Sequence, residues 1–114
     1  MKYLCLLLPF PPTINGLYAG GTRGRFKNKK YVAWEREAFH AIRSQKLVYF
    51  EKPVGITLSY GRPDKRVRDL LNYSKAPMDF LVKAHVLADD SLIERAVEQW
   101  SEAVVGCQIE ISER

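Results

Sequence analysis

The chain has 114 residues, which is enough for a single domain over residues 1–114 and too few for a second hydrophobic core. Its composition, with 46% hydrophobic and 27% charged residues, excludes a disordered chain, and no apolar run is long enough to span a membrane. The net charge of +5 favours a polyanionic partner, although a surplus of this size is also common among proteins that bind none.

The first strand is expected at residues 2–10, apolar on both faces and ended by prolines. Residues 11–30, rich in Pro, Asn and Gly, predict a long irregular loop. A helix is expected over residues 31–46. Its apolar face should hold Trp34, Ala38, Ala41 and Ile42, and its solvated face Glu35, Arg36, Arg43 and Lys46.

Alternating apolar residues predict a second strand over 54–60, followed by a basic turn. A second helix is expected at residues 69–84, with a kink at Pro77. Two further strands are expected at 92–100 and 104–111, with Gly106 as a bulge between them. The order strand, helix, strand, helix, strand, strand predicts an α+β domain, in which two main helices pack on a small mixed sheet.

The apolar start of the chain, residues 1–8, is too short for a signal peptide and lacks a small-residue cleavage site. We therefore expect a cytoplasmic protein. The two cysteines, Cys5 and Cys107, lie in apolar runs without a CxxC pattern or a histidine cluster. This predicts buried, reduced thiols and no structural zinc site.

Half of the 18 basic residues fall in two short segments, which is the distribution that a phosphate-contacting surface needs. The first segment contains Arg23, Arg25, Lys27, Lys29 and Lys30. The second contains Arg62, Lys65, Arg66 and Arg68. Both are therefore candidate DNA-binding segments.

Three carboxylates are candidate ligands of a metal ion that would neutralise a phosphate and activate water, namely Asp69, Asp89 and Asp90. Lys75 could stabilise developing charge at the same phosphate. Each also has an ordinary explanation, as a helix N-cap, a solvated turn or a solvated lysine. Spacing alone does not bring Asp69 and Asp90 together.

The stretch RPDKRVRDLLNYSKAPMDFLVKAHVLADDSLI, residues 62–93, resembles the signature region of the RusA family of Holliday-junction resolvases. That region has a basic run, an Asp-x-Asp-Asn motif, a lysine four residues after its second Asp, and an Asp-Asp pair before a strand. LPFPPTINGLY, residues 8–18, resembles the opening strand and loop of the same family. The resemblance implies an Mg²⁺-dependent endodeoxyribonuclease that cuts four-way junctions and other branched DNA as a homodimer.

Position by position, the resemblance gives Asp69 as the first motif Asp, Asn72 as the motif Asn and Lys75 as the functional lysine. It gives Asp89 and Asp90 as the acidic pair, with Asp90 as the essential metal-binding member. The second motif Asp falls on Leu71, which cannot bind a metal ion. Asp64, Asp79 and Glu94 are possible substitutes. An alternative is therefore a junction-binding protein with weakened or lost catalysis, and a second is a nucleic-acid-binding module without metal chemistry.

Leu71 falls beside Met78 and Val82 on the expected second helix, where the three form a minor apolar stripe. The stripe either contributes to a homodimer contact or packs under the N-terminal loop. The basic turn next to Asp69 would hold the DNA backbone near the scissile phosphate. Two loop aromatics, Tyr18 and Phe26, could wedge into an open junction centre or pack back on their own domain.

Overall fold

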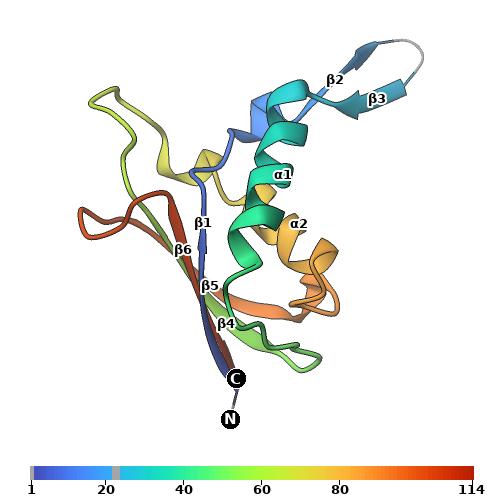
Figure 1. The fold of residues 1–114 in the computed structure, drawn as a ribbon, viewed down its shortest axis with the longest axis vertical. Helices are drawn as coiled ribbons and strands as arrows, with labels where there is room; N and C mark the ends of the chain where they lie inside the picture. Colours follow the sequence, from blue (N-terminus) through green and yellow to red (C-terminus); the bar gives the residue numbers. More distant parts are fainter. Residues whose placement is uncertain (1, 22–23) are drawn as a thin grey trace.

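The computed structural model describes residues 2–21 and 24–114 and contains a four-stranded sheet in the order β1-β6-β4-β5 (Figure 1). Its strands are β1 (Tyr3–Leu8), β4 (Val54–Tyr60), β5 (Ile93–Trp100) and β6 (Cys107–Glu113). Strand β6 is antiparallel to both β1 and β4, whereas β4 and β5 are parallel. Helices α1 (Lys29–Ile42) and α2 (Lys75–Lys83) lie on one side of this sheet. The prediction of an α+β domain with a mixed sheet and two main helices is confirmed.

Strand β1 is apolar on both faces, as expected, but only one of these faces is buried. Leu4, Leu6 and Leu8 point into the core, whereas Tyr3 and Leu7 are about half exposed. The reason is that the helices cover only one face of the sheet. Cys5 lies on the open face and is exposed, which corrects its prediction as a buried thiol, whereas Cys107 is buried as expected.

Strand β4 occupies the range expected from its alternation, but β6 begins three residues later than expected. Gly106 precedes β6 and is not a bulge between two strands. Its φ of 84° is favourable only for glycine, and a Cβ atom there would lie 2.4 Å from the carbonyl oxygen of Leu8. The glycine therefore lets the turn before β6 pass closely over the end of β1.

Helix α1 begins two residues before its expected start, because the side chain of Asn28 caps it by accepting a hydrogen bond from the backbone N–H of Lys30. The helix ends at Ile42 and buries Trp34 and Ala38 as expected. Glu35 was expected in solvent, yet it is buried.

The second helix is shorter than expected, because residues 70–72 form a separate 3₁₀ turn, η2 (Leu70–Asn72), and α2 starts only at Lys75. Pro77 is thus the third residue of α2 and not a mid-helix residue. A proline in the first turn costs no intrahelical hydrogen bond, so the expected kink has no cause. Helix α2 buries Ala76, Pro77, Phe80 and Leu81.

The segment expected to be an irregular loop contains a 3₁₀ turn, η1 (Ile14–Gly16), and a hairpin of β2 (Tyr18–Gly21) and β3 (Gly24–Lys27). Figure 1 shows this hairpin projecting from the body beyond the start of α1. A last 3₁₀ turn, η3 (Asp90–Leu92), precedes β5. None of the described helices is long and apolar enough to cross a membrane.

Candidate nucleic-acid interface

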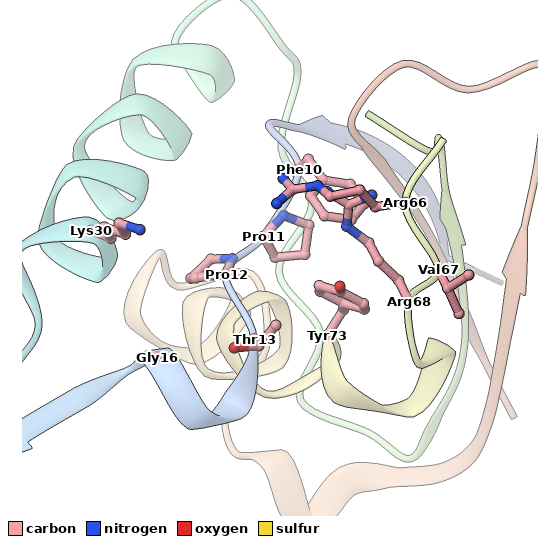
Figure 2. Close-up of a pocket in the computed structure, with 10 residues that line it drawn as sticks. All are labelled: Phe10, Pro11, Pro12, Thr13, Gly16, Lys30, Arg66, Val67, Arg68 and Tyr73. Carbon is pink, nitrogen blue, oxygen red and sulfur yellow. The ribbon is translucent and has the colours of Figure 1, made fainter. Parts of the chain in front are cut away.

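The two basic segments meet across one cavity of about 550 Å³ at the start of α1. Figure 2 shows Lys30 on one side of it and Arg66 and Arg68 on the other. The remaining lining residues are Phe10, Pro11, Pro12, Thr13, Gly16, Val67 and Tyr73. Cations more than thirty residues apart in the sequence therefore face the same space, an arrangement suited to an anionic chain.

Aromatic side chains pack together along the cavity wall. The rings of Phe10 and Tyr73 lie 5.0 Å apart between centroids, and the guanidinium of Arg68 lies 5.8 Å from the centroid of Phe10. Two consecutive prolines, Pro11 and Pro12, restrict the backbone of the segment that crosses the cavity. The contact with Phe10 helps to hold Arg68 in place before any ligand binds.

Asp64 organises the basic turn. Its carboxylate accepts hydrogen bonds from the backbone N–H of Arg66 at 2.9 Å, from Nε of Arg66 at 3.1 Å and from a guanidinium nitrogen of Arg68 at 2.9 Å. The hydrogen bonds from Arg68 and then Arg66 hold the pKa of Asp64 well below its usual range. Asp64 is thus already partnered by two arginines, which makes it less available as a metal ligand.

Lys27, which is predicted to contact DNA, is paired with a carboxylate of the protein. Its Nζ donates to both carboxylate oxygens of Glu35, at 2.8 and 3.0 Å, and Lys83 donates to the same carboxylate at 3.1 Å. Glu35 therefore connects β3, α1 and α2 through one buried charge. The burial of Glu35 could have been predicted from the sequence, because Glu35 lies four residues after Tyr31 and three before Ala38, on the apolar face of α1.

Among the other predicted cations, Lys29, Arg62 and Lys65 are exposed. Arg23 lies outside the described residues, and of Arg25 only the backbone, in β3, is described. Of the two candidate wedge residues, Phe26 is 63% exposed on the hairpin. Tyr18 instead packs its ring against Tyr31, with 5.9 Å between centroids.

Asp69 stands at the N-cap position of η2, but its side chain makes no capping hydrogen bond. The ordinary explanation of this residue as a helix cap is therefore not what the structure contains. Lys75 is the first residue of α2, and its Nζ lies 3.2 Å from a carboxylate oxygen of Asp79. Asp79, like Asp64, is thus paired with a cation.

Asp89 caps the N-terminus of η3. Its carboxylate accepts hydrogen bonds from the backbone N–H of Ser91, at 3.0 Å, and from the Ser91 hydroxyl. These bonds lower the pKa of Asp89. Asp90 is exposed in the first turn of η3.

The three candidate carboxylates do not form a ready cluster, since the described residues contain no group of three or more potential metal ligands. A hydrated Mg²⁺ ion nevertheless needs only one or two carboxylates, together with waters and phosphate oxygens of a substrate. Asp69, whose side chain makes no capping hydrogen bond, and the exposed Asp90 are each available as such a ligand.

Leu71 lies in η2 and is 73% exposed, whereas Met78 and Val82 lie in α2 and pack partly against the core. The expectation of one apolar stripe along a single helix was therefore wrong, because the helix does not extend back to Leu71. An aspartate at this exposed position would meet solvent, so nothing in the fold requires the leucine.

Comparison with known proteins identifies relatives over most of the chain. Residues 9–112 match the family model described as endodeoxyribonuclease RusA. The crossover junction endodeoxyribonuclease RusA of Escherichia coli K12 is 33% identical over 99 residues, which cover 82% of this chain and 78% of that protein. The protein of the same name from Shigella sonnei is 32% identical over an equal span.

Proposed function

Because the chain belongs to the RusA family of endodeoxyribonucleases, we propose that it is a nuclease that acts on Holliday junctions and other branched DNA. The observation that carries the proposal is the cavity where Lys30 faces Arg66 and Arg68, immediately before Asp69 in the sequence. Arg68, one of these cations, directly precedes Asp69 in the chain, and the Asp69 side chain makes no capping hydrogen bond. Contacts between such cations and phosphates position DNA without reading its bases.

In this proposal Asp69 and Asp90 hold Mg²⁺, which when bound neutralises the phosphate and lowers the pKa of a water ligand. Lys30, Arg66 and Arg68 hold the DNA backbone. Lys75, released from Asp79 when a phosphate approaches, donates hydrogen bonds to the oxygens on which charge develops. Asp89 keeps its capping role and sets the backbone around Asp90.

The proposal includes a homodimer, because symmetric cutting of a four-way junction requires two equivalent sites related by a two-fold axis. The exposed Leu71, with the half-buried Met78 and Val82 nearby in sequence, remains a candidate for the dimer contact. We place the protein in the cytoplasm, where its DNA substrate lies. A Met78→Glu/Val82→Glu variant that remains dimeric in sedimentation equilibrium would exclude this contact.

A second candidate function is junction binding with weakened or lost cleavage, and Leu71 is the observation that favours it. The side chain stands where the family has a second carboxylate, and a site with one carboxylate fewer binds Mg²⁺ more weakly. The two candidates share the DNA-binding surface and differ only in turnover.

One experiment distinguishes them. A synthetic four-way junction is incubated with wild type, Asp90→Asn, Leu71→Asp and the control Glu51→Gln, an exposed carboxylate outside the candidate site, with and without Mg²⁺. Cleavage by wild type and by the control, lost in Asp90→Asn, supports the nuclease. Binding without cleavage by wild type, with cleavage restored in Leu71→Asp, supports the second candidate. A Leu71→Asp variant that binds the junction and never cuts it contradicts nuclease activity.

A further inference from the structure

We propose that Trp100 and Arg62 form a stacking subsite for one unpaired nucleobase of the DNA. The inference rests on the proposed function for the identity of the ligand as DNA. It adds a recognition element outside the phosphate-binding cavity, with a flat aromatic ligand in place of an anionic one.

Trp100 is held rigidly at the end of β5. Its ring stacks on Phe10 with 6.3 Å between centroids and 11° between planes. The rings of Tyr60 and Tyr73 each lie 5.9 Å away at steep angles. The tryptophan is therefore fixed by three neighbours, yet it remains partly exposed to solvent.

The guanidinium of the exposed Arg62 lies 4.4 Å from the centroid of the Trp100 ring. The two side chains border a second cavity of about 480 Å³, which Ser101, Glu102 and Val104 complete. Its wall thus combines an aromatic surface, a planar cation and polar groups at the edge. This is the chemistry that a nucleobase matches, because its faces stack on aromatic rings and guanidinium planes while its edge forms hydrogen bonds.

The loops on both sides of this cavity are fixed against each other. The backbone N–H of Gly61 donates to the carbonyl of Gly106 at 2.9 Å, and that of Ser101 donates to the carbonyl of Tyr60 at 2.8 Å. A Cβ atom at Gly61 would lie only 1.9 Å from the carbonyl oxygen of Val104. Only glycine permits this approach, which holds Arg62 next to Trp100 before a ligand binds.

The subsite is continuous with the phosphate-binding cavity. Phe10 lines that cavity and also carries the stacked Trp100 ring. Arg62 belongs to the same basic turn as Arg66 and Arg68. One DNA strand can therefore place phosphates at the turn and a base at Trp100, provided that the base is not paired within a duplex. A preference for branched or single-stranded DNA over linear duplex follows from this arrangement.

The test uses Trp emission and binding affinity together, in EDTA so that no strand is cut. The chain has two tryptophans, and the other, Trp34, is buried with its ring N–H bonded to the carbonyl of Pro9. A fluorescein-labelled four-way junction, a single strand and a linear duplex are titrated by anisotropy. Intrinsic emission is recorded for wild type and Trp100→Phe, in which only Trp34 emits.

We expect the junction and the single strand to quench wild-type emission and to leave the emission of Trp100→Phe unchanged. Trp100→Leu should bind the junction about tenfold more weakly. Trp100→Phe, which keeps an aromatic ring, should remain close to wild type. Both Trp100 variants should bind linear duplex as strongly as wild type does. Arg62→Gln provides a second, exposed substitution that also weakens junction binding, should Trp100→Leu fail to fold.

Junction binding with unchanged wild-type emission, or with equal affinity for wild type, Trp100→Leu and Arg62→Gln, overturns the subsite and leaves the proposed function standing. Equal quenching by linear duplex overturns the requirement for an unpaired base. Absence of any binding to the junction overturns the proposed function as well.

Discussion

At the scale of single residues, Leu71 is a position where we expect substitution to leave stability unchanged and to affect only catalysis. Its side chain is largely exposed in a 3₁₀ turn and contributes little to the core. Leu71 is the position at which the resemblance implies a carboxylate, so we expect a change there to affect chemistry and not folding. Core leucines of the same chain, such as Leu81, contribute to stability instead, because they are fully buried.

Leu71→Asp is expected to change the free energy of unfolding by no more than about 0.5 kcal/mol, because the position is exposed. Leu81→Asp, the matched control, should unfold the protein, because it buries an unpaired charge. Urea denaturation followed by circular dichroism measures both. A Leu71→Asp variant destabilised as strongly as the control would show that Leu71 packs against something essential.

The buried thiol of Cys107 is expected to lower the stability of the fold in alkaline solution. Burial raises the pKa of its thiol from 9.0 to about 12. The thiol of the unfolded chain therefore loses its proton at a lower pH than the thiol of the folded chain. The resulting contribution to stability is fully present below pH 9, and it is lost as the pH rises from about 9 to about 12. Thermal midpoints of wild type and Cys107→Ala across this range test the effect. The thermal midpoint of Cys107→Ala should fall less with pH than that of wild type. Equal falls in the two proteins would contradict the raised pKa of Cys107.

At the scale of elements, one buried carboxylate connects three pieces of secondary structure. Glu35 in α1 pairs with Lys27 at the end of β3 and with Lys83 at the end of α2. The nearest backbone connection between β3 and α2 runs through the whole of α1 and β4, so the ion pairs are a direct link between distant segments. The hairpin is thereby attached to the helical layer at its base.

Glu35→Gln is expected to destabilise the fold by about 2 kcal/mol, because two charge-assisted hydrogen-bond partners lose their buried anion. Glu37→Gln, an exposed change on the same helix, should have almost no effect. The free energy of unfolding in urea measures the difference. Equal values for the two variants would mean that solvent already screens the Lys27–Glu35–Lys83 group.

At the scale of the whole molecule, the fold converts a modest net charge into a local positive surface. Lys30 and Arg66 come from different parts of the sequence and face the same cavity. Lys27 and Lys83, in contrast, have their charges matched by Glu35. We therefore expect DNA affinity to depend on the cations that face this cavity and not on the total number of cations.

Lys30→Gln and Arg66→Gln are each expected to weaken junction binding and to reduce the slope of log K against log salt by about 1, because each removes one phosphate contact. Arg43→Gln, at the opposite end of α1 from Lys30, is the matched control and should leave the slope unchanged. Anisotropy titrations between low and moderate salt provide the slopes. A shallower slope for Arg43→Gln alone would place the DNA elsewhere.

The sequence predicted the fold class, the strand β4 and the apolar face of α1, because periodic burial leaves a strong pattern. It did not predict the hairpin between β2 and β3, since the glycines that permit a tight hairpin also occur in irregular loops. The start of α2 was misplaced because residues 70–73 continue the helical spacing, although Leu70–Asn72 form a separate 3₁₀ turn and α2 begins only at Lys75. The convergence of the two basic segments could not be predicted, because it depends on how α1 and the basic turn pack around Phe10.

The order of strands in the sheet has a consequence for synthesis on the ribosome. Strand β6 is the last in the sequence, yet it lies inside the sheet between β1 and β4 and pairs residue 3 with residue 112. Strand β1 therefore has no partner in the sheet until residues 107–113 have left the exit tunnel. The nascent chain must therefore keep β1 unpaired in the sheet until β6, the last of the four strands to be made, is available.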